Sequence, residues 1–389
     1  MVVGASVRGC QVAVIGGGPG GYLAAIRLAQ LKKDVILVEA EPSLGGICLN
    51  EGCIPSKALI HAADFYSATK TSAVMGIDVE GASVDMDRLI DWKEAIVQNL
   101  TGGVKFLAEK NGAEVLHGRA RFKGERALEV DTGDGMQEIE FEQAVIATGS
   151  SAFFPPGFEP DGDVILGSRE ALSLREVPGK LVVIGAGYIG LELGSVYRKF
   201  GSEVTMVEFL PELLEHHDED LRKTLSKRLD TLGIDVHLGS KATAIEKGKP
   251  SVITVERDGE TFTLEADKVL VSVGRRPNTG DLGLDAAGVE TDDRGFIQVN
   301  DRMETSVPGI YALGDVVGGA LLAHKAYREA KVAAEVIAGE PAAFDNVVVP
   351  AVIYTDPEIA WAGMSEREAK EEGYEVVTGH SPSGLRAAP

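Results

Sequence analysis

The sequence has few cysteines, few positive charges and no long apolar run. Three cysteines in 389 residues cannot staple the chain together, which excludes the disulfide scaffold of a small secreted protein. Lysine and arginine total 38 against 60 acidic residues, and the net charge of −22 argues against binding to nucleic acid or to an anionic membrane. No apolar run reaches the ~20 residues that cross a bilayer, since candidates such as 181–196 are interrupted by glycine and by Glu192. We therefore expect a cytoplasmic protein.

Glycine, by contrast, is in excess. The chain holds 47 glycines, about 12% against a usual ~7%, and they follow no collagen-like period. Glycine allows tight turns and lets the backbone approach a ligand closely, so the excess is a weak indication of nucleotide binding. At ~150 residues per domain, the length predicts two or three domains.

A glycine fingerprint follows the first apolar strand. Residues 12–15 (VAVI) lead into Gly16, Gly18 and Gly21, then a helical segment, then a second apolar strand that ends at Glu39. Such glycines let the backbone touch a pyrophosphate, the helix N-terminus attracts it, and the acid accepts hydrogen bonds from a ribose. A lone GxGxxG can be merely a tight turn, but the flanking strands, the helix and the acid complete the fingerprint of a dinucleotide site.

The same arrangement occurs a second time. An apolar strand at 181–184 precedes Gly185, Gly187 and Gly190, and the next strand ends at Glu208. The distance from the first glycine to the glutamate is the same in both copies. The negative charge of Glu208 would repel the extra phosphate of NADP, so the second copy is predicted to prefer NAD.

Three further segments are expected to complete the two sheets. They are AVIATGS at 144–150, KVLVSVGRRPN at 268–278, and GIYALGD, which ends at Asp315. We predict an α/β fold with two Rossmann-like dinucleotide-binding domains and an incomplete third domain of the α+β type. The predicted bounds are 1–150 and 279–345 for a discontinuous first domain, 151–278 for the second, and 346–389 for the third.

Two cysteines lie close together in GGICLNEGCIPSK. On a regular helix, Cys48 and Cys53 would be separated by an axial rise of roughly 7.5 Å, beyond the ~4.4–6.8 Å between Cα atoms that a disulfide tolerates. A bridge therefore needs an irregular helix start, which Gly52 and Pro55 permit. The alternatives are two unrelated buried thiols, a reversible dithiol, or a zinc site. Zinc is disfavoured because no second CxxC or histidine cluster offers further ligands, so we predict no metal; Cys10 lies outside the pattern.

Together these segments resemble the flavin-dependent disulfide reductases, and among them the dihydrolipoamide dehydrogenases. The cysteine segment has the CLNxGCIPSK form of the latter, whereas glutathione reductases typically read CVNxGCVPKK. The resemblance extends from about Val12 to His380 and includes ATG, GRRPN, LAHKA at 322–326 and YTDPEIAWAG. In this family the third domain is the interface of a homodimer.

The resemblance implies FAD at the first fingerprint and NAD at the second. FAD would be held by Gly16, Gly18, Gly21, Glu39, Lys57, Ala120, Thr148, Gly149, Asp315 and Ala323. NAD would be held by Gly185, Gly187, Gly190, Glu208, Ala242 and Gly274.

The resemblance also assigns the chemistry to four residues. Cys53 would be the thiol nearest the flavin, and Cys48 the outer thiol that exchanges with substrate. Lys57 would lie by the flavin N5 and pair with Glu192. From the residues alone, Lys57 is typical of a solvated helix lysine, and a buried Glu192 needs a partner. The implied reaction is oxidation by NAD⁺ of the dihydrolipoyl arm of a 2-oxo acid dehydrogenase complex or a similar lipoyl protein.

The C-terminus departs from the family pattern. The family carries a His-Pro segment in which a histidine, paired with a glutamate, acts as acid and base across the homodimer. None of the seven histidines here is followed by proline, and the end SPSGLRAAP is off pattern. We therefore expect a shortened interface domain, slow turnover of dihydrolipoamide and a weakened dimer. Alternatives are another NAD(P)H-dependent disulfide or mercuric reductase, and a non-catalytic flavoprotein that serves as a redox or binding subunit.

Overall fold

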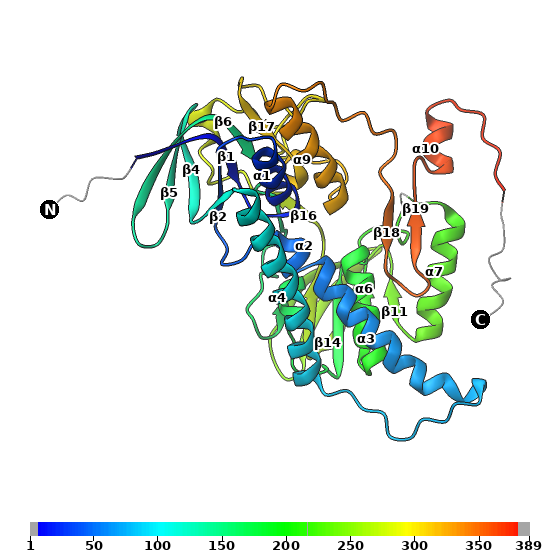
Figure 1. The fold of residues 1–389 in the computed structure, drawn as a ribbon. Coiled ribbons are helices and arrows are strands. Elements are labelled where there is room, and N and C mark those ends of the chain that lie inside the picture. The colour runs from blue at the N-terminus through cyan, green and yellow to red at the C-terminus, as the bar shows by residue number, and fades with distance from the viewer. Residues whose placement is uncertain (1–6, 216, 380–389) are drawn as a thin grey trace.

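The computed structural model describes residues 7–215 and 217–379, and these residues form the predicted α/β fold. Figure 1 shows the first sheet at the upper left, beside α1 and α9, and the second sheet at the lower right, beside α6 and α7. The C-terminal segment with β18 and β19 runs alongside the second sheet and α7.

The first sheet is built around β1, the strand that precedes the first glycine turn. Its order is β3-β2-β1-β6-β5-β4, and β17 also pairs with β6. β1 pairs in parallel with β2 and β6, whereas β4, β5 and β6 form antiparallel pairs. Because β17 pairs in parallel with β6, the sheet joins segments from both halves of the sequence. The strands are β1 Val7–Ile15, β2 Val35–Glu39, β3 Glu114–His117, β4 Arg119–Gly124, β5 Ala127–Asp131, β6 Met136–Ile146 and β17 Ile310–Ala312.

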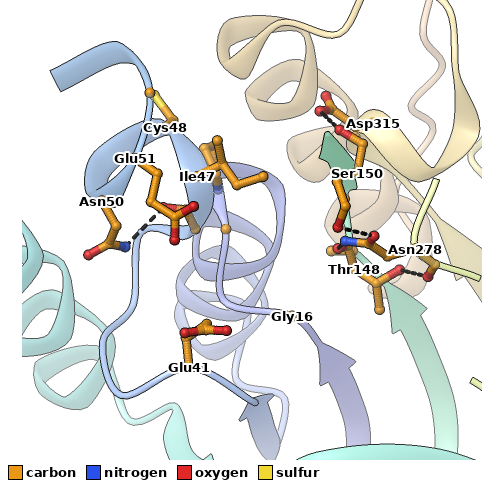
Figure 2. Close-up of a pocket in the computed structure, with 18 of the residues that line it drawn as sticks. Gly16, Glu41, Ile47, Cys48, Asn50, Glu51, Thr148, Ser150, Asn278 and Asp315 are labelled. Carbon is orange, nitrogen blue, oxygen red and sulfur yellow. Dashed lines mark hydrogen bonds between the residues drawn. The ribbon is translucent and has the colours of Figure 1, made fainter. Parts of the chain in front are cut away.

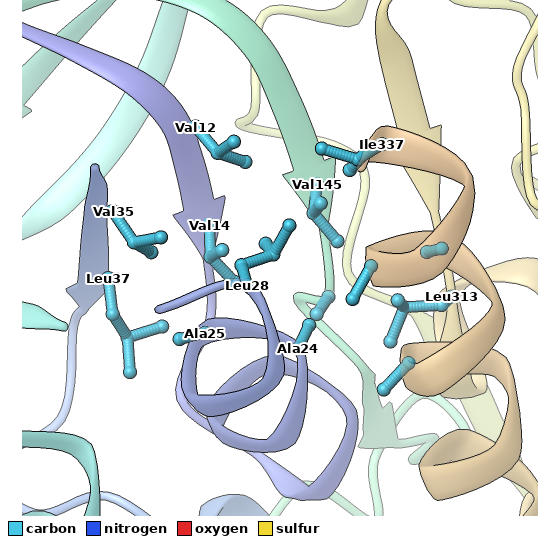
Figure 3. Packing of buried hydrophobic residues seen from close by; sticks show 14 of the residues in the cluster. Val12, Val14, Ala24, Ala25, Leu28, Val35, Leu37, Val145, Leu313 and Ile337 are labelled. Carbon is cyan, nitrogen blue, oxygen red and sulfur yellow. The ribbon is translucent and has the colours of Figure 1, made fainter. Parts of the chain in front are cut away.

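Helices α1 (Pro19–Gln30) and α9 (Ala323–Ile337) cover one face of this sheet. Figure 3 shows Val12 and Val14 of β1 packed against Leu28 of α1, with Ile337 of α9 close by. The alternate residues of β1, such as Ala13, pack into a second cluster on the other face. Burial on both faces explains why the strands read as continuous apolar runs.

The second sheet repeats this architecture around β9. It is parallel, with the order β11-β10-β9-β15-β8. Leu181 and Val183 of β9 pack with α6, and Val182 and Ile184 pack against the antiparallel sheet β12-β13-β14. The elements are β8 Ile165–Leu166, β9 Lys180–Ile184, α6 Tyr188–Phe200, β10 Glu203–Val207, α7 Glu219–Leu232, β11 Asp235–His237, β12 Lys241–Glu246, β13 Ser251–Arg257, β14 Glu260–Ala266 and β15 Lys268–Val271.

The remaining elements connect the two sheets or follow them. The antiparallel pair β7–β16 lies between the sheets in the sequence, and β18–β19 is a separate antiparallel pair. These remaining elements are α2 Gly46–Asn50, α3 Cys53–Thr71, the 3₁₀ helix η1 Ser72–Met75, α4 Met86–Asn111, β7 Ser150–Ala152, α5 Ser168–Ala171, β16 Arg275–Pro277, α8 Leu284–Ala287, the 3₁₀ helix η2 Gly314–Val317, β18 Ala351–Ile353, β19 Ile359–Trp361 and α10 Glu366–Glu371.

The strand–helix–strand units of both fingerprints lie where the sequence predicts them. Their strands and helices follow the predicted order, and the two sheets are the Rossmann-like sheets that the sequence predicts. The bounds proposed for the domains stay a prediction. In the described part of the chain, no helix combines the length and the hydropathy needed to span a bilayer.

Candidate active site

The first glycine turn brings the backbone of β1 close to the start of α1. Gly16 has a φ of +99°, and a Cβ there would lie 2.4 Å from the carbonyl oxygen of Ala147. A Cβ on Gly21 would lie 1.7 Å from the carbonyl oxygen of Gly16. No side chain caps the N-terminus of α1, so its N–H groups and partial positive charge remain available to an anion.

The two fingerprint glutamates make the same contacts in each copy. Glu39 accepts hydrogen bonds from the backbone N–H of Gly17 at 2.6 Å and of Glu41 at 2.8 Å. Glu208 accepts equivalent bonds from Ala186 at 2.7 Å and Leu210 at 2.9 Å. Each acid therefore fixes its glycine turn in addition to any contact with a ribose. Burial raises the pKa of Glu39, although these amide hydrogen bonds oppose the shift.

The two cysteines flank a break between two helices, as their spacing requires. Cys48 lies in α2 and Cys53 begins α3, and Gly52 between them has φ −140° and ψ −107°. This irregular backbone brings the two Sγ atoms to 2.6 Å. Both cysteines are unbridged here, and Cys10 lies apart in β1. The break supplies the irregular helix start that a reversible Cys48–Cys53 pair needs.

The two thiols of the pair have opposite acidities. The pKa of Cys53 is lowered to about 7, first because the Cys48 thiol donates a hydrogen bond to it and also because Lys57 is nearby, although burial opposes the shift. The pKa of Cys48 is raised by its hydrogen bond to Cys53 and by burial. The thiolate of a reduced pair therefore resides on Cys53, and Cys48 keeps its proton.

Lys57 and Glu192 form an ion pair beside the cysteines. Lys57 lies one helical turn after Cys53 in α3, and Glu192 lies in the first turns of α6. The Lys57 Nζ is 2.9 Å from the Glu192 Oε2, and the glutamate is only 5% exposed. The pair joins α3 to α6, the helix of the second glycine turn, and it gives the buried carboxylate the partner it needs.

A cavity of about 910 Å³ contains these groups. In Figure 2, Cys48 and Glu51 lie on one side, and Asp315, Ser150 and Thr148 lie on the other. Twelve predicted site residues line the cavity: Gly16, Gly18, Glu39, Cys48, Cys53, Lys57, Ala120, Thr148, Gly149, Glu192, Asp315 and Ala323. Gly21 lies just behind the lining, against Gly16.

Comparison with known proteins places the chain in a family. The model of the pyridine nucleotide-disulphide oxidoreductases matches residues 10–330, and that of their dimerisation domain matches residues 349–386. The chain belongs to this family. The pyridine nucleotide-disulphide oxidoreductases of the flavin-dependent type use FAD and NAD(H).

Curated relatives of this chain include dihydrolipoyl dehydrogenases. That of Haloferax volcanii is 47% identical over 388 residues, and that of Geobacillus stearothermophilus is 46% identical over 383 residues. Each alignment covers 98% of this chain and 81% of the relative. Among solved structures, the HOCl-induced flavoprotein disulfide reductase RclA from Escherichia coli superposes with a TM-score of 0.82 at 30% identity, over 94% of this chain and 80% of RclA.

The cavity fits the FAD of this family of oxidoreductases. A Cβ on Gly18 would project into the space beside the helix N-terminus, where its nearest protein atom is the Cα of Gly46 at 3.8 Å. That space is the cradle that a diphosphate requires, because glycine alone leaves it open next to the uncapped N-terminus of α1. Asp315 of η2 and Ala323 at the start of α9 also line this cavity, although they lie much later in the sequence.

The predicted NAD residues lie around the second glycine turn, outside the lining of this cavity. Gly187 is the N-cap of α6, and the other glycines of the turn repeat the close contacts of the first copy. Gly274 has a φ of +134°, and its carbonyl accepts a hydrogen bond from Phe153. Ala242 lies in β12 and packs partly buried against the second-sheet cluster.

Two groups of residues that the sequence analysis did not assign also contact this site. The Ser150 hydroxyl donates to Asp315 at 2.6 Å, and Arg275 donates to both the hydroxyl and the carbonyl of Ser150. Tyr354 lies against the Lys57–Glu192 pair. All of them fall in segments that carry the family resemblance, but their roles depend on contacts between distant parts of the chain, which no local spacing indicates.

Proposed function

We propose that this chain is a dihydrolipoyl dehydrogenase, which oxidises a protein-bound dihydrolipoyl group with NAD⁺. The observation that carries the proposal is the Cys48–Cys53 pair, with its thiolate on Cys53, beside the Lys57–Glu192 pair and open to the cavity of the first glycine turn. The curated relatives named dihydrolipoyl dehydrogenase support the choice of substrate.

The cysteines carry the exchange with substrate. One substrate thiolate attacks the Cys48 Sγ of the oxidised pair, the S–S bond breaks, and Cys53 leaves as a thiolate. Cys53 leaves readily because the positive charge of Lys57 lies near it and stabilises the departing thiolate. The second substrate thiol gives up its proton and attacks the substrate sulfur of the mixed disulfide. The bond to the Cys48 Sγ breaks, the cyclic disulfide is released, and Cys48 takes up the proton, so both cysteines are reduced. Two electrons have then moved from the substrate to the cysteine pair.

The residues around the cysteine pair stabilise the charges that form during this exchange reaction. Lys57 stabilises the Cys53 thiolate by its positive charge, and Glu192 holds the ammonium in place. A bound FAD would supply the acceptor for the two electrons and the hydride donor for NAD⁺. The residues proposed to hold FAD are Gly16, Gly18, Gly21, Glu39, Lys57, Ala120, Thr148, Gly149, Asp315 and Ala323. Those proposed to hold NAD are Gly185, Gly187, Gly190, Glu208, Ala242 and Gly274.

Partner, assembly and location are part of the same proposal. The substrate is the dihydrolipoyl arm of a 2-oxo acid dehydrogenase complex or of a similar lipoyl protein. The match of residues 349–386 to the dimerisation domain supports a homodimer. A cytoplasmic location stays a prediction.

The test is an anaerobic titration of the FAD-loaded protein with dihydrolipoamide, followed by NAD⁺. We expect the first addition to produce two reactive thiols and a long-wavelength absorbance from the Cys53 thiolate beside the flavin. The second addition should restore the oxidised spectrum and produce NADH. C53S and C48S should abolish the response, and C10S should leave it intact because Cys10 lies apart in β1.

The same titration separates this proposal from other disulfide reductases. With NADP⁺ in place of NAD⁺, reoxidation should be about tenfold slower or worse, since ~1.4 kcal/mol of repulsion by Glu208 corresponds to one factor of ten. Faster reoxidation by NADP⁺ would contradict the proposal. So would a flavin that dihydrolipoamide does not reduce, although NAD(P)H reduces it and another disulfide substrate then reoxidises it. A flavin that neither dihydrolipoamide nor NADH reduces would indicate a non-catalytic subunit.

A further inference from the structure

Tyr354 contacts both members of the Lys57–Glu192 pair. It follows β18 directly, and its backbone N–H donates to the Glu192 Oε1 at 3.0 Å. The Lys57 Nζ lies 4.3 Å from the centroid of the Tyr354 ring. One residue from the C-terminal part of the chain therefore binds the carboxylate through its amide and the ammonium through its ring.

These contacts restrict both charged groups. One oxygen of the Glu192 carboxylate accepts from Lys57 and the other accepts from Tyr354, so its orientation is fixed from two sides. Lys57 also donates to the Ser56 hydroxyl at 3.3 Å. Its side chain is 33% exposed, and without the ring one side of the ammonium would be open. The face of an aromatic ring attracts a cation, so the ring favours the paired position.

The turn after Tyr354 is anchored independently of the redox site. Asp356 pairs with Arg228 of α7 and lies 3.3 Å from the Nζ of Lys199 in α6. Lys199 is only 6% exposed and also pairs with Asp64 of α3. The anchor fixes the backbone two residues beyond Tyr354, which restricts where the tyrosine amide and ring can lie.

We propose that Tyr354 is a positioning residue of the redox site, whose ring holds the Lys57 ammonium against Glu192 and toward the cysteine pair. This inference rests on the proposed function, because it takes the Cys53 thiolate as the group that the Lys57 charge serves. Tyr354 itself takes part in no bond that forms or breaks.

The test compares Y354F, which keeps the ring, with Y354L, which keeps an apolar side chain but has no ring face. The readout is the pH titration of the long-wavelength thiolate absorbance in the reduced, FAD-loaded protein. Because the Lys57 charge lowers the pKa of Cys53, a less restrained ammonium should move the titration midpoint upward. We expect Y354F to match wild type and Y354L to shift by ~0.5 pH unit, or ~0.7 kcal/mol at 1.36 kcal/mol per unit.

A matched control is Y374L, because Tyr374 is 60% exposed and lies after α10. Y374L should leave the midpoint unchanged. An unchanged midpoint in a folded, FAD-loaded Y354L would overturn the proposal, and so would an equal shift in Y354F. If wild type itself shows no thiolate absorbance, the proposed function fails instead, which distinguishes the two failures.

A second variant decides the question if Y354L does not fold. D356N leaves the tyrosine in place but weakens the anchor to Lys199 and Arg228, and D345N is its control at the exposed Asp345–Arg328 pair. We expect a smaller upward shift of the midpoint in D356N and none in D345N. Equal midpoints in both variants would overturn the proposal.

Discussion

The acidity of Cys53 depends mainly on one hydrogen-bond donor. The Cys48 thiol is the largest cause of the lowered pKa of Cys53, ahead of the charge of Lys57. As the pH rises through about 7, Cys53 loses its proton and becomes the nucleophile, whereas Cys48 stays protonated. Cys10 provides an internal reference in the same chain, because burial raises its pKa to about 11.

We predict that C48A raises the pKa of Cys53 from about 7 toward the ordinary value of 9.0, because the donor is lost. C48S should keep a lower pKa, since a hydroxyl still donates. The measurement is the pH dependence of iodoacetamide labelling of the reduced protein, with the labelled peptides identified by mass spectrometry. Equal midpoints in C48A and wild type would contradict the assignment of the hydrogen bond as the main cause. Cys10 should remain unlabelled over the same range in every variant.

At the scale of elements, helix α9 supports the turn that carries Asp315. Lys325 and Glu329 form a buried ion pair on α9, with Nζ and Oε1 2.6 Å apart and exposed fractions of 9% and 3%. The Oε2 of Glu329 accepts a hydrogen bond from the backbone N–H of Gly314 at 2.8 Å. The pair therefore fixes the backbone next to Asp315, although neither residue lines the cavity.

We predict that E329Q lowers the free energy of unfolding by about 3–5 kcal/mol, because it leaves the Lys325 ammonium buried without a counter-charge. The measurement is the shift of the urea unfolding midpoint. The matched control is E219Q, since Glu219 and Lys223 form a pair of the same spacing on the exposed surface of α7. This control should not measurably change the midpoint. Similar shifts in both variants would show that the burial of the α9 pair is not the cause.

The strands, turns and helices of the two fingerprints are determined by residues that lie close together in the sequence, so the sequence predicts them. The strand, glycine turn, helix and acid of each fingerprint lie within one short segment, so their spacing alone indicates them. The break between α2 and α3 is likewise indicated by Gly52 and by the separation of the cysteines. The turn contacts of Glu39 and Glu208 were not predicted, because the fingerprint assigns these acids to a ribose.

Contacts between distant segments are the part that the residues alone do not indicate. From the sequence alone, Lys57 is typical of a solvated lysine. Its pairing with Glu192 is predicted only by the family resemblance. The hydrogen bond from Ser150 to Asp315 joins residues 165 apart in the sequence, and that from Tyr354 to Glu192 joins residues 162 apart. The fold brings these distant segments together, and no local pattern encodes their contacts.

At the scale of the whole molecule, the cavity draws on nearly the full length of the chain. Its lining runs from Ile15 to Ala326 and includes Glu192 of the second glycine-turn unit. A ligand that fills it contacts both units and binds only the folded state. Such a ligand stabilises the protein by about 2.7 kcal/mol at a concentration of 100 times its Kd.

We therefore predict that FAD raises the unfolding temperature of the FAD-free protein by several degrees, and that riboflavin, which lacks the diphosphate and the adenosine, raises it much less. Differential scanning fluorimetry measures both.

In G17A, the FAD effect should be largely lost, because a Cβ on Gly17 would lie 2.7 Å from the Glu39 Oε2 and 2.5 Å from Leu44, displacing the acid that fixes the turn. G187A is the control, since a Cβ there meets no protein atom within 4 Å and the second turn lies outside this cavity. An FAD effect of equal size in G17A and G187A would mean that the first glycine turn does not hold the diphosphate.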